Sequence, residues 1–351
     1  MIEQHYNSLS VKVFFALIAT WLMIGSTRVC AQRLTAEVVE LDSLMFPEQE
    51  ALIGTIDDLD IGTDGDIFIV DRLGQQVFGF SKDGKLKVKV SPEVCDPGFS
   101  FTPWALSVNR SYMFLQNDGP WGFLFHSDGR CLSNVDDNYL MLLKAGLTAN
   151  NRLFGILRGF GERPYKLVVA DIDGRTIKEM EIPDSDFTVA DKFIEGGGLA
   201  AKGDIYYFAP SVSPVLYELN MENNSVTKID ISKKINLDTP SEDLPAGDIN
   251  PAFVQQASQI VLGRDINRGV YIIEDKYLFV QYSHASKTGG DWKWLIYDLE
   301  NEEVQTVQES SFGLFRIIDD EGYRLIQPPL DNDNNLPNPY FKKYKLNIRS
   351  N

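Results

Sequence analysis

"TDGDIFIVDRLGQQVFGFSKDGK", residues 63–85, carries two Asp-Gly pairs nineteen residues apart, with two strand-like runs between them. Runs rich in β-branched and aromatic residues, such as 66–71 and 76–80, are typical of strands. Asp-Gly pairs are typical of the tight turns that join antiparallel strands. Together with the runs at 53–61 and 85–90, the stretch predicts a four-stranded antiparallel meander.

The same order of strands and turns recurs along the chain. Similar segments cover residues 104–132, 147–182, 199–231 and 270–307, and a sixth begins at residue 312. A period of this length is typical of propellers and solenoids, in which each repeat packs against its neighbours. We therefore predict an all-β fold, a six-bladed β-propeller built of four-stranded antiparallel blades.

The sixth segment has room for only three strands, of which the third is expected at 340–347. A strand at 33–41 precedes the first repeat and belongs to none of the six. In a ring this N-terminal strand would close the last blade and would cover an edge that is otherwise open to aggregation.

The first repeat carries a family resemblance. Residues 53–86 ("IGTIDDLDIGTDGDIFIVDRLGQQVFGFSKDGKL"), followed by "DPGFSFTPWALSV" at 96–108, resemble the NHL-type repeat. The whole chain looks like the exported six-bladed propellers that are common in Bacteroidota. The resemblance implies a location in the bacterial envelope and a propeller that binds a ligand or a protein.

One segment departs from the repeat. Residues 233–263 hold three prolines and then "PAFVQQASQIVL", in which Phe253, Val254, Ala257, Ile260 and Val261 follow helical spacing. Proline suits the first turn of a helix, and an asparagine before it suits the N-cap. We expect a short helical insertion between blades four and five.

The N-terminal residues differ in composition from the rest. An apolar run at 13–24 is too short to span a bilayer but suits the core of a signal peptide. Small residues at Val29 and Ala31 predict cleavage after Ala31, so residues 1–31 form the leader and 32–351 a single exported domain. The alternative is a lipid anchor at Cys30, although Val29 and Arg28 fit a lipobox poorly. No later segment has the length of a membrane span.

The bulk composition excludes one class of partner. The formal net charge is −17, and an acidic body repels phosphate backbones, so we expect no nucleic-acid partner. The hydrophobic share of 44% is ample for a core, and 21 Phe and 14 Tyr favour strands. Cys95 and Cys131 remain after the leader, and the propeller topology places them on opposite faces, so we expect two free thiols.

Motifs for catalysis and for metal binding are weak. The chain has no Gly-x-Ser-x-Gly, His-Glu-x-x-His or Cys-x-x-Cys pattern. "DNDNN" at 331–335 begins like a calcium loop, but Leu336 stands where the turn needs Gly and Lys342 where a Glu should follow.

Topology indicates where a ligand would bind. In a propeller, the loops between blades and those between the second and third strands share one face, and the middle loops grow in repeats three, five and six. Trp104, Arg268 and Arg316 are expected near the starts of inner strands, with Trp104 packed between blades. The residues that we expect to contact a ligand are Arg72, Asp118, Trp121, Arg158, Arg163, His284 and Trp292.

Two functions remain open. The first is a binding module without a cofactor, whose channel face holds a protein, peptide or glycan. The alternative is a metal-dependent hydrolase or lactonase, with a divalent cation such as calcium in the channel held by Asp57, Asp58 and Glu195. Arg268 and Arg316 would oppose a cation there, so a channel of mixed charge favours the binding module.

Overall fold

The computed structural model describes most of the chain beyond the N-terminal segment. The described residues are 34–91, 102–117, 122–135, 142–157, 165–183, 187, 191, 197–237, 255, 264–284, 291–331 and 336–350.

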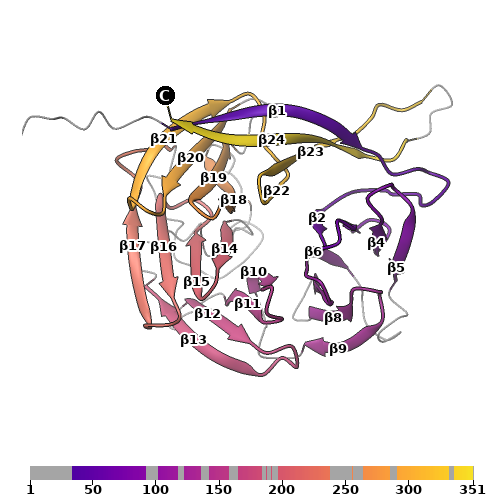
Figure 1. Cartoon of the computed structure of the whole chain (residues 1–351), viewed down its shortest axis with the longest axis horizontal. Helices are drawn as coiled ribbons and strands as arrows, with labels where there is room; N and C mark the ends of the chain where they lie inside the picture. Colours follow the sequence, from indigo (N-terminus) through magenta and orange to yellow (C-terminus); the bar gives the residue numbers. More distant parts are fainter. Residues whose placement is uncertain are drawn as a thin grey trace, which may run out of the picture.

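These residues form six antiparallel sheets of four strands each, arranged as the blades of a propeller (Figure 1). The strands that the sequence predicts at 66–71, 76–80 and 85–90 are observed at 67–71, 76–80 and 86–90. Each blade begins at the channel with its first strand and ends at the rim with its fourth. The strands of blades one to three are β2 (Asp58–Ile61), β3 (Ile67–Asp71), β4 (Gln76–Phe80), β5 (Leu86–Val90), β6 (Pro103–Val108), β7 (Tyr112–Asn117), β8 (Gly122–His126), β9 (Cys131–Val135), β10 (Leu142–Leu147), β11 (Leu153–Leu157), β12 (Tyr165–Ala170) and β13 (Thr176–Ile182).

Blades four to six complete the ring. In blade six, three strands come from the C-terminal part of the chain and the outermost one, β1, comes from its N-terminal part. Leu34 lies opposite Ser350 and Leu44 opposite Phe341, so the two ends of the described chain run side by side (Figure 1). The strands are β14 (Gly198–Lys202), β15 (Ile205–Ala209), β16 (Val215–Asn220), β17 (Ser225–Asp230), β18 (Asp265–Ile273), β19 (Tyr277–His284), β20 (Trp292–Asp298), β21 (Glu303–Ser310), β22 (Arg316–Ile318), β23 (Glu321–Ile326), β24 (Tyr340–Ser350) and β1 (Leu34–Leu44).

The fold class needs one correction. All the elements of secondary structure among the described residues are strands, so the expected helical insertion between blades four and five is not among them. Its sequence falls at 251–262, of which only Gln255 belongs to the described residues. Helical spacing in one short apolar run is weak evidence, because such runs do not distinguish a helix from other buried segments. The part of the chain that is described holds no helix able to cross a bilayer.

The core is divided among the contacts between blades. Six clusters of buried hydrophobic side chains lie in the described structure, and each joins one blade to the next. Phe78 and Phe80 of blade one, for example, share a cluster with Tyr323 and Phe341 of blade six. This distribution is typical of repeat proteins, in which a single repeat cannot bury its own apolar face.

Tight turns at the predicted Asp-Gly pairs connect the third and fourth strands of blades one and two. Gly84 and Gly129 follow Asp83 and Asp128 with φ of +82° and +88°. Glycine enters this left-handed region without the steric cost that a Cβ atom brings. These turns fix the start of the fourth strand of blades one and two.

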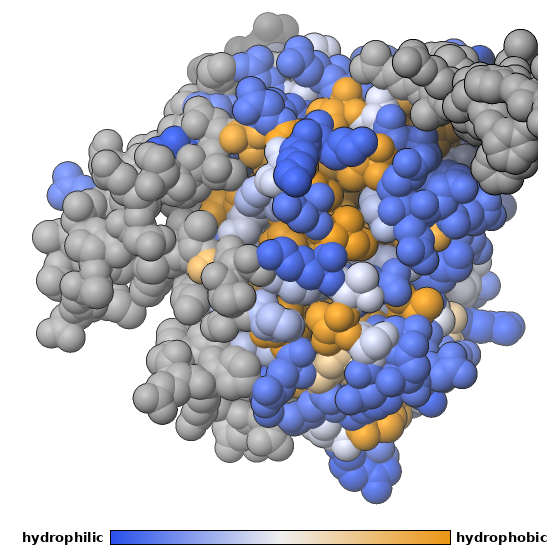
Figure 2. Space-filling view, turned by 90° about the vertical axis from the view of Figure 1, so that its left-hand side faces the viewer, coloured by the Kyte–Doolittle hydropathy of each residue, from blue (hydrophilic) through white to orange (hydrophobic). Residues whose placement is uncertain are grey.

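The outer side of the ring is mainly polar. Figure 2 shows one side of the molecule, on which hydrophilic residues dominate and smaller hydrophobic areas lie between them. The outer strand β17 fits this pattern, since Thr227, Lys228 and Asp230 are exposed.

The expectation of free thiols is wrong for Cys131, which is disulfide-bonded. Its partner cysteine lies outside the described residues. The expectation rested on placing Cys131 and the end of the first blade on opposite faces. A Cβ atom at Gly129 would lie 2.8 Å from Val88 and 3.5 Å from Val90, so the turn before Cys131 packs against β5 of the preceding blade.

Candidate functional site

The channel of the ring holds two neighbouring cavities. One, of about 560 Å³, opens beside the start of β20 and the ends of other strands at the loop face, and we call it the loop-face cavity. The other, of about 510 Å³, lies toward the turns that follow the inner strands, and we call it the turn-face cavity. Both are lined by Lys144, Ala145, Arg268, Tyr271 and Arg316, which form a shared neck.

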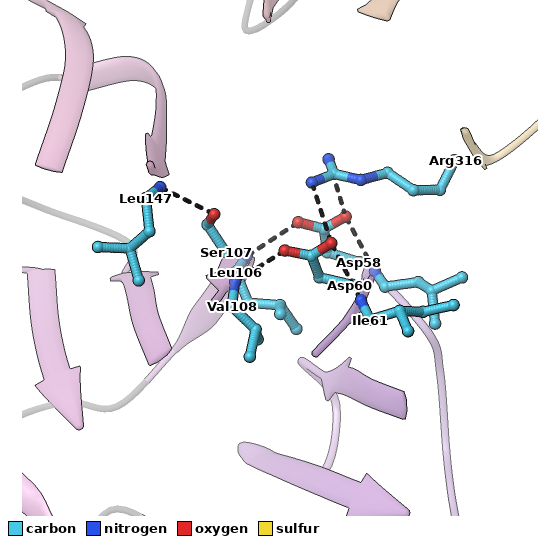
Figure 3. A network of polar contacts seen from close by, with 9 residues as sticks. Asp58, Asp60, Ile61, Leu106, Ser107, Val108, Leu147 and Arg316 are labelled. Carbon is cyan, nitrogen blue, oxygen red and sulfur yellow. Dashed lines mark hydrogen bonds and ion pairs between the residues drawn. The ribbon is translucent and has the colours of Figure 1, made fainter. Parts of the chain in front are cut away.

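Side chains of the inner strands bind the backbone of the next blade. The Leu106 N–H donates to Asp58 Oδ2 over 2.8 Å, and the Val108 N–H donates to Asp60 Oδ2 over 2.7 Å. The Leu147 N–H donates in turn to Ser107 Oγ over 2.9 Å (Figure 3). Because inner strands of different blades share no ladder, these side chains satisfy backbone donors that would otherwise face the channel unpaired.

The two aspartates also hold Arg316 in the neck. The Arg316 guanidinium lies 3.8 Å from Asp58 Oδ1 and 3.8 Å from Asp60 Oδ1 (Figure 3). Burial alone would lower the pKa of Arg316, but the charges of Asp58 and Asp60 more than reverse this and raise it. Burial raises the pKa of Asp60 to about 6, although the Arg316 charge opposes the rise. The cluster therefore holds a fixed cation beside a carboxyl group that titrates near neutral pH.

Asp60 should make stability depend on pH. Its folded-state pKa of about 6 lies above its ordinary value of 3.8, so the folded protein binds this proton more tightly and loses stability as the pH rises through about 6. We expect wild type to lose about 1.5 kcal/mol relative to Asp60→Asn between pH 5 and pH 8. Urea unfolding at both pH values measures this difference, and the asparagine can still accept the Val108 hydrogen bond. A difference between the two proteins that does not change with pH would refute the assignment.

Arg268 occupies the neck in a different way. It lies at a bulge of β18, between Asn267 and Gly269, where the register with β19 shifts. Its Nε donates to Ser283 Oγ over 2.8 Å. Among the described residues no carboxylate lies within ion-pair distance of Arg268, and desolvation lowers its pKa. The positive charge of Arg316 is thus neutralised by two carboxylates, whereas no described carboxylate neutralises that of Arg268.

Two tryptophans line the loop-face cavity. Trp104 is half-buried, donates from Nε1 to the Asn117 carbonyl over 3.2 Å, and has the Lys144 ammonium 5.6 Å from its ring centroid. Trp104 of blade two thus contacts Lys144 of blade three and also lines the cavity. Trp292 is also half-buried, and its ring lies against Gly313, where an added Cβ atom would come within 2.3 Å of three ring atoms.

The structure brings together part of the predicted site. His284 and Trp292 line the loop-face cavity, as do Asp57 and Asp58. Arg72 does not line it, because Arg72 is exposed in the loop after β3, where its N–H donates to Asp57 Oδ2. The predicted residues that lie outside the described residues are Asp118, Trp121, Arg158, Arg163 and Glu195.

Of the predicted cation ligands, Asp57 and Asp58 are described and Glu195 is not. Among the described residues no group of three or more His, Cys, Asp or Glu side chains is placed to hold a metal ion. Asp57 accepts a hydrogen bond from Thr55 Oγ1 over 2.8 Å, whereas Asp58 faces Arg316. A guanidinium between Asp58 and Asp60 supplies the positive charge that a divalent cation would otherwise bring.

Sequence reasoning missed Asp60, Lys144 and Tyr271, which all belong to inner strands. A usable signal was present in the alternation along β2, where Asp58 and Asp60 are two residues apart and so point to the same side of the strand. In an inner strand that side faces the channel or the next blade. An inspection of polar residues at alternate positions of inner strands would have found this pair.

Comparisons with known proteins show the fold alone. No protein-family model and no curated protein matches the sequence. A member of the DUF4221 family from Bacteroides vulgatus is similar in structure, with a TM-score of 0.56 at 9% identity, covering 92% of this chain and 100% of that one. A protein from Bacteroides fragilis that is named a candidate exported protein has a TM-score of 0.53 at 11% identity, covering 92% and 98%.

Proposed function

We propose that this propeller is a binding protein, and that its loop-face cavity holds the end of a glycan chain. The observation that carries the proposal is the lining of that cavity, in which Trp104, Trp292 and Arg268 meet in one space of about 560 Å³. A volume of this size is in the range of small-molecule sites, about 300–1,000 Å³. It suits one or a few sugar units better than the surface of a folded protein.

The indole of Trp292 supports a glycan over a peptide. One face of the ring lies against the Gly313 backbone, and the side chain is half-buried and lines the cavity. An aromatic ring carries partial negative charge on its face, so the C–H groups on the apolar side of a sugar pack favourably against it. Polar side chains nearby, including Gln116 and Ser283, offer partners for sugar hydroxyls.

We also propose that the chain is exported, with cleavage after Ala31, and that its repeats are of the NHL type. The disulfide at Cys131 supports export, because disulfides persist mainly in oxidising compartments. The structural likeness to a protein named as a candidate exported protein points the same way.

The described contacts favour a site without a resident cation over the metal-dependent hydrolase. Asp58 and Asp60 are engaged by Arg316 and by backbone N–H groups of the next blade. Lys144 and Arg268 add positive charge at the same neck. Arg268, whose charge no described carboxylate neutralises, would repel a divalent cation placed there.

Removing the indole should abolish glycan binding. We expect Trp292→Ala to lower the affinity for any oligosaccharide that binds the wild type by at least about 10-fold, because a well-packed aromatic anchor contributes more than 1 kcal/mol. The measurement is a screen of neutral and acidic oligosaccharides, and of peptides, followed by calorimetry on the hits. Lys228→Ala, on the outer strand β17, is the control and should bind as wild type does. Binding of peptides alone, or of no oligosaccharide at millimolar concentration, would refute the proposal.

A further inference from the structure

We infer that the sugar held in the loop-face cavity is an acidic one, bearing a carboxylate that pairs with Arg268. This inference rests on the proposed function and names the ligand class of the same site. Its first support is the difference between the two arginines of the neck. Arg316 lies within 3.8 Å of two carboxylates, whereas no described carboxylate pairs with Arg268.

The local structure aims Arg268 at the cavity. The bulge between Asn267 and Gly269 takes Arg268 out of the ladder with β19, and its side chain is among those that line both cavities. Bulges commonly redirect a side chain next to a functional site. The hydrogen bond from Nε to Ser283 Oγ fixes the guanidinium and leaves its terminal N–H groups for a ligand.

The same hydrogen bond places the charge beside the aromatic surface. Ser283 of β19 lies directly opposite Trp292 of β20 in the ladder of blade five. Directly opposite side chains in an antiparallel pair have Cβ atoms about 5 Å apart on one side of the sheet. Arg268, Ser283 and Trp292 therefore form one row across blade five, with a cation at one end and a flat ring at the other.

A hexuronic acid matches this row. Its ring can lie against Trp292 while the carboxylate, which projects from the ring edge, reaches the guanidinium. The planar fork of arginine pairs with a carboxylate through two parallel hydrogen bonds, which gives direction as well as affinity. Lys144 adds a second positive charge at the neck, where it lies over the ring of Trp104. The lining as a whole is of mixed charge, since Asp57, Asp58 and Asp291 also belong to it, so the pairing rests on Arg268, which no described carboxylate neutralises.

The surrounding acidic protein does not prevent this pairing. Charges of the outer surface are screened over about 8 Å at physiological ionic strength. A direct pair between the Arg268 guanidinium and a bound carboxylate is much shorter than this length, so it is screened much less. The Arg268 guanidinium therefore attracts a bound carboxylate at short range, and the acidic outer surface has little effect on that pair.

The test compares matched sugars. Calorimetry with short oligosaccharides of glucuronic and galacturonic acid, and with the corresponding glucose and galactose oligosaccharides, measures the preference for the carboxylate. We expect the wild type to bind at least one acidic oligosaccharide about 10- to 100-fold more tightly than its neutral counterpart. Arg268→Gln should remove this preference and leave the affinity for the neutral sugar within about twofold.

Two further variants distinguish loss of the ion pair between Arg268 and the carboxylate from a general loss of structure or surface charge. Ser283→Ala removes the group that fixes Arg268 but keeps the charge, so we expect a partial loss, about 3- to 10-fold, for the acidic sugar only. Arg175→Gln, at an exposed turn of blade three, removes an arginine of the surface and should bind both sugars as wild type does. Melting curves of all variants check the fold.

The outcomes distinguish the inference from the proposed function. Equal affinity for acidic and neutral sugars, or an acid preference that survives Arg268→Gln, would overturn the inference and leave the glycan-binding function standing. Failure of every oligosaccharide to bind would overturn both. Binding of peptides through a terminal carboxylate that depends on Arg268 would also overturn the glycan assignment.

Discussion

Gly198→Ala is expected to cost more than about 4 kcal/mol and to prevent normal closure of the ring. Gly198 begins the inner strand of blade four, and a Cβ atom there would lie 2.2 Å from the Val270 nitrogen and 2.7 Å from the Gly269 carbonyl carbon. These are backbone atoms of the next inner strand, so no side-chain rotation relieves the overlap. Blades four and five would have to separate, which exposes the hydrophobic cluster between them.

A second glycine provides the control. Gly203, in the turn after the same strand, has φ of +61° and nothing within 4 Å of an added Cβ atom. We expect Gly203→Ala to cost about 1–2 kcal/mol, the strain of a left-handed alanine alone. Urea unfolding followed by tryptophan fluorescence compares the two variants. Equal losses would show that the close approach of blades four and five is not what makes Gly198 necessary.

Asn338→Ala should be the next most damaging change, with a loss of about 3 kcal/mol. Asn338 precedes β24, and its Nδ2 donates to the carbonyls of Phe46 (3.0 Å) and Ala51 (2.7 Å), while its Oδ1 accepts from the Ile53 N–H (2.9 Å). All three bonds are buried, and they hold the segment that leads from β1 into blade one. Alanine would leave three backbone groups without partners, each costing about 1 kcal/mol or more.

Gln308 also makes hydrogen bonds from its side-chain amide to backbone groups, but these bonds are closer to solvent. Its amide exchanges two hydrogen bonds of 3.1 Å with the backbone of Ala36, and these are only partly buried. We expect Gln308→Ala to cost about 1 kcal/mol, because water can replace the lost partner. Unfolding free energies from urea curves rank the variants. If Gln308→Ala proved as damaging as Asn338→Ala, burial of the Asn338 bonds would not explain its effect.

The blades could be predicted from the sequence because each strand and turn is encoded locally. The Asp-Gly turns and the alternation of side chains mark the strands whatever their neighbours are, and six repeats of one pattern reinforce each other. The expected helix rested on a single segment with no second copy to check it. This difference explains why the blade pattern was predicted well and the insertion was not.

The site depends on relations between blades, which no single repeat reveals. Trp104 of blade two lines the cavity together with Lys144 of blade three and Trp292 of blade five. The pairing of Arg316 with Asp58 joins residues of blades six and one. The contact of the turn at Gly129 with Val88 likewise joins blades two and one, and the first repeat alone does not predict it.

The pairing of β1 with β24 has a mechanical consequence. Leu34 lies opposite Ser350, so a force that pulls these two residues apart acts at one end of the ladder. Cross-strand hydrogen bonds run perpendicular to antiparallel strands, and they would break one pair after another instead of sharing the force. A protein tethered by both ends would therefore open at blade six under low tension, whereas a pull across the ring would meet the resistance of whole blades.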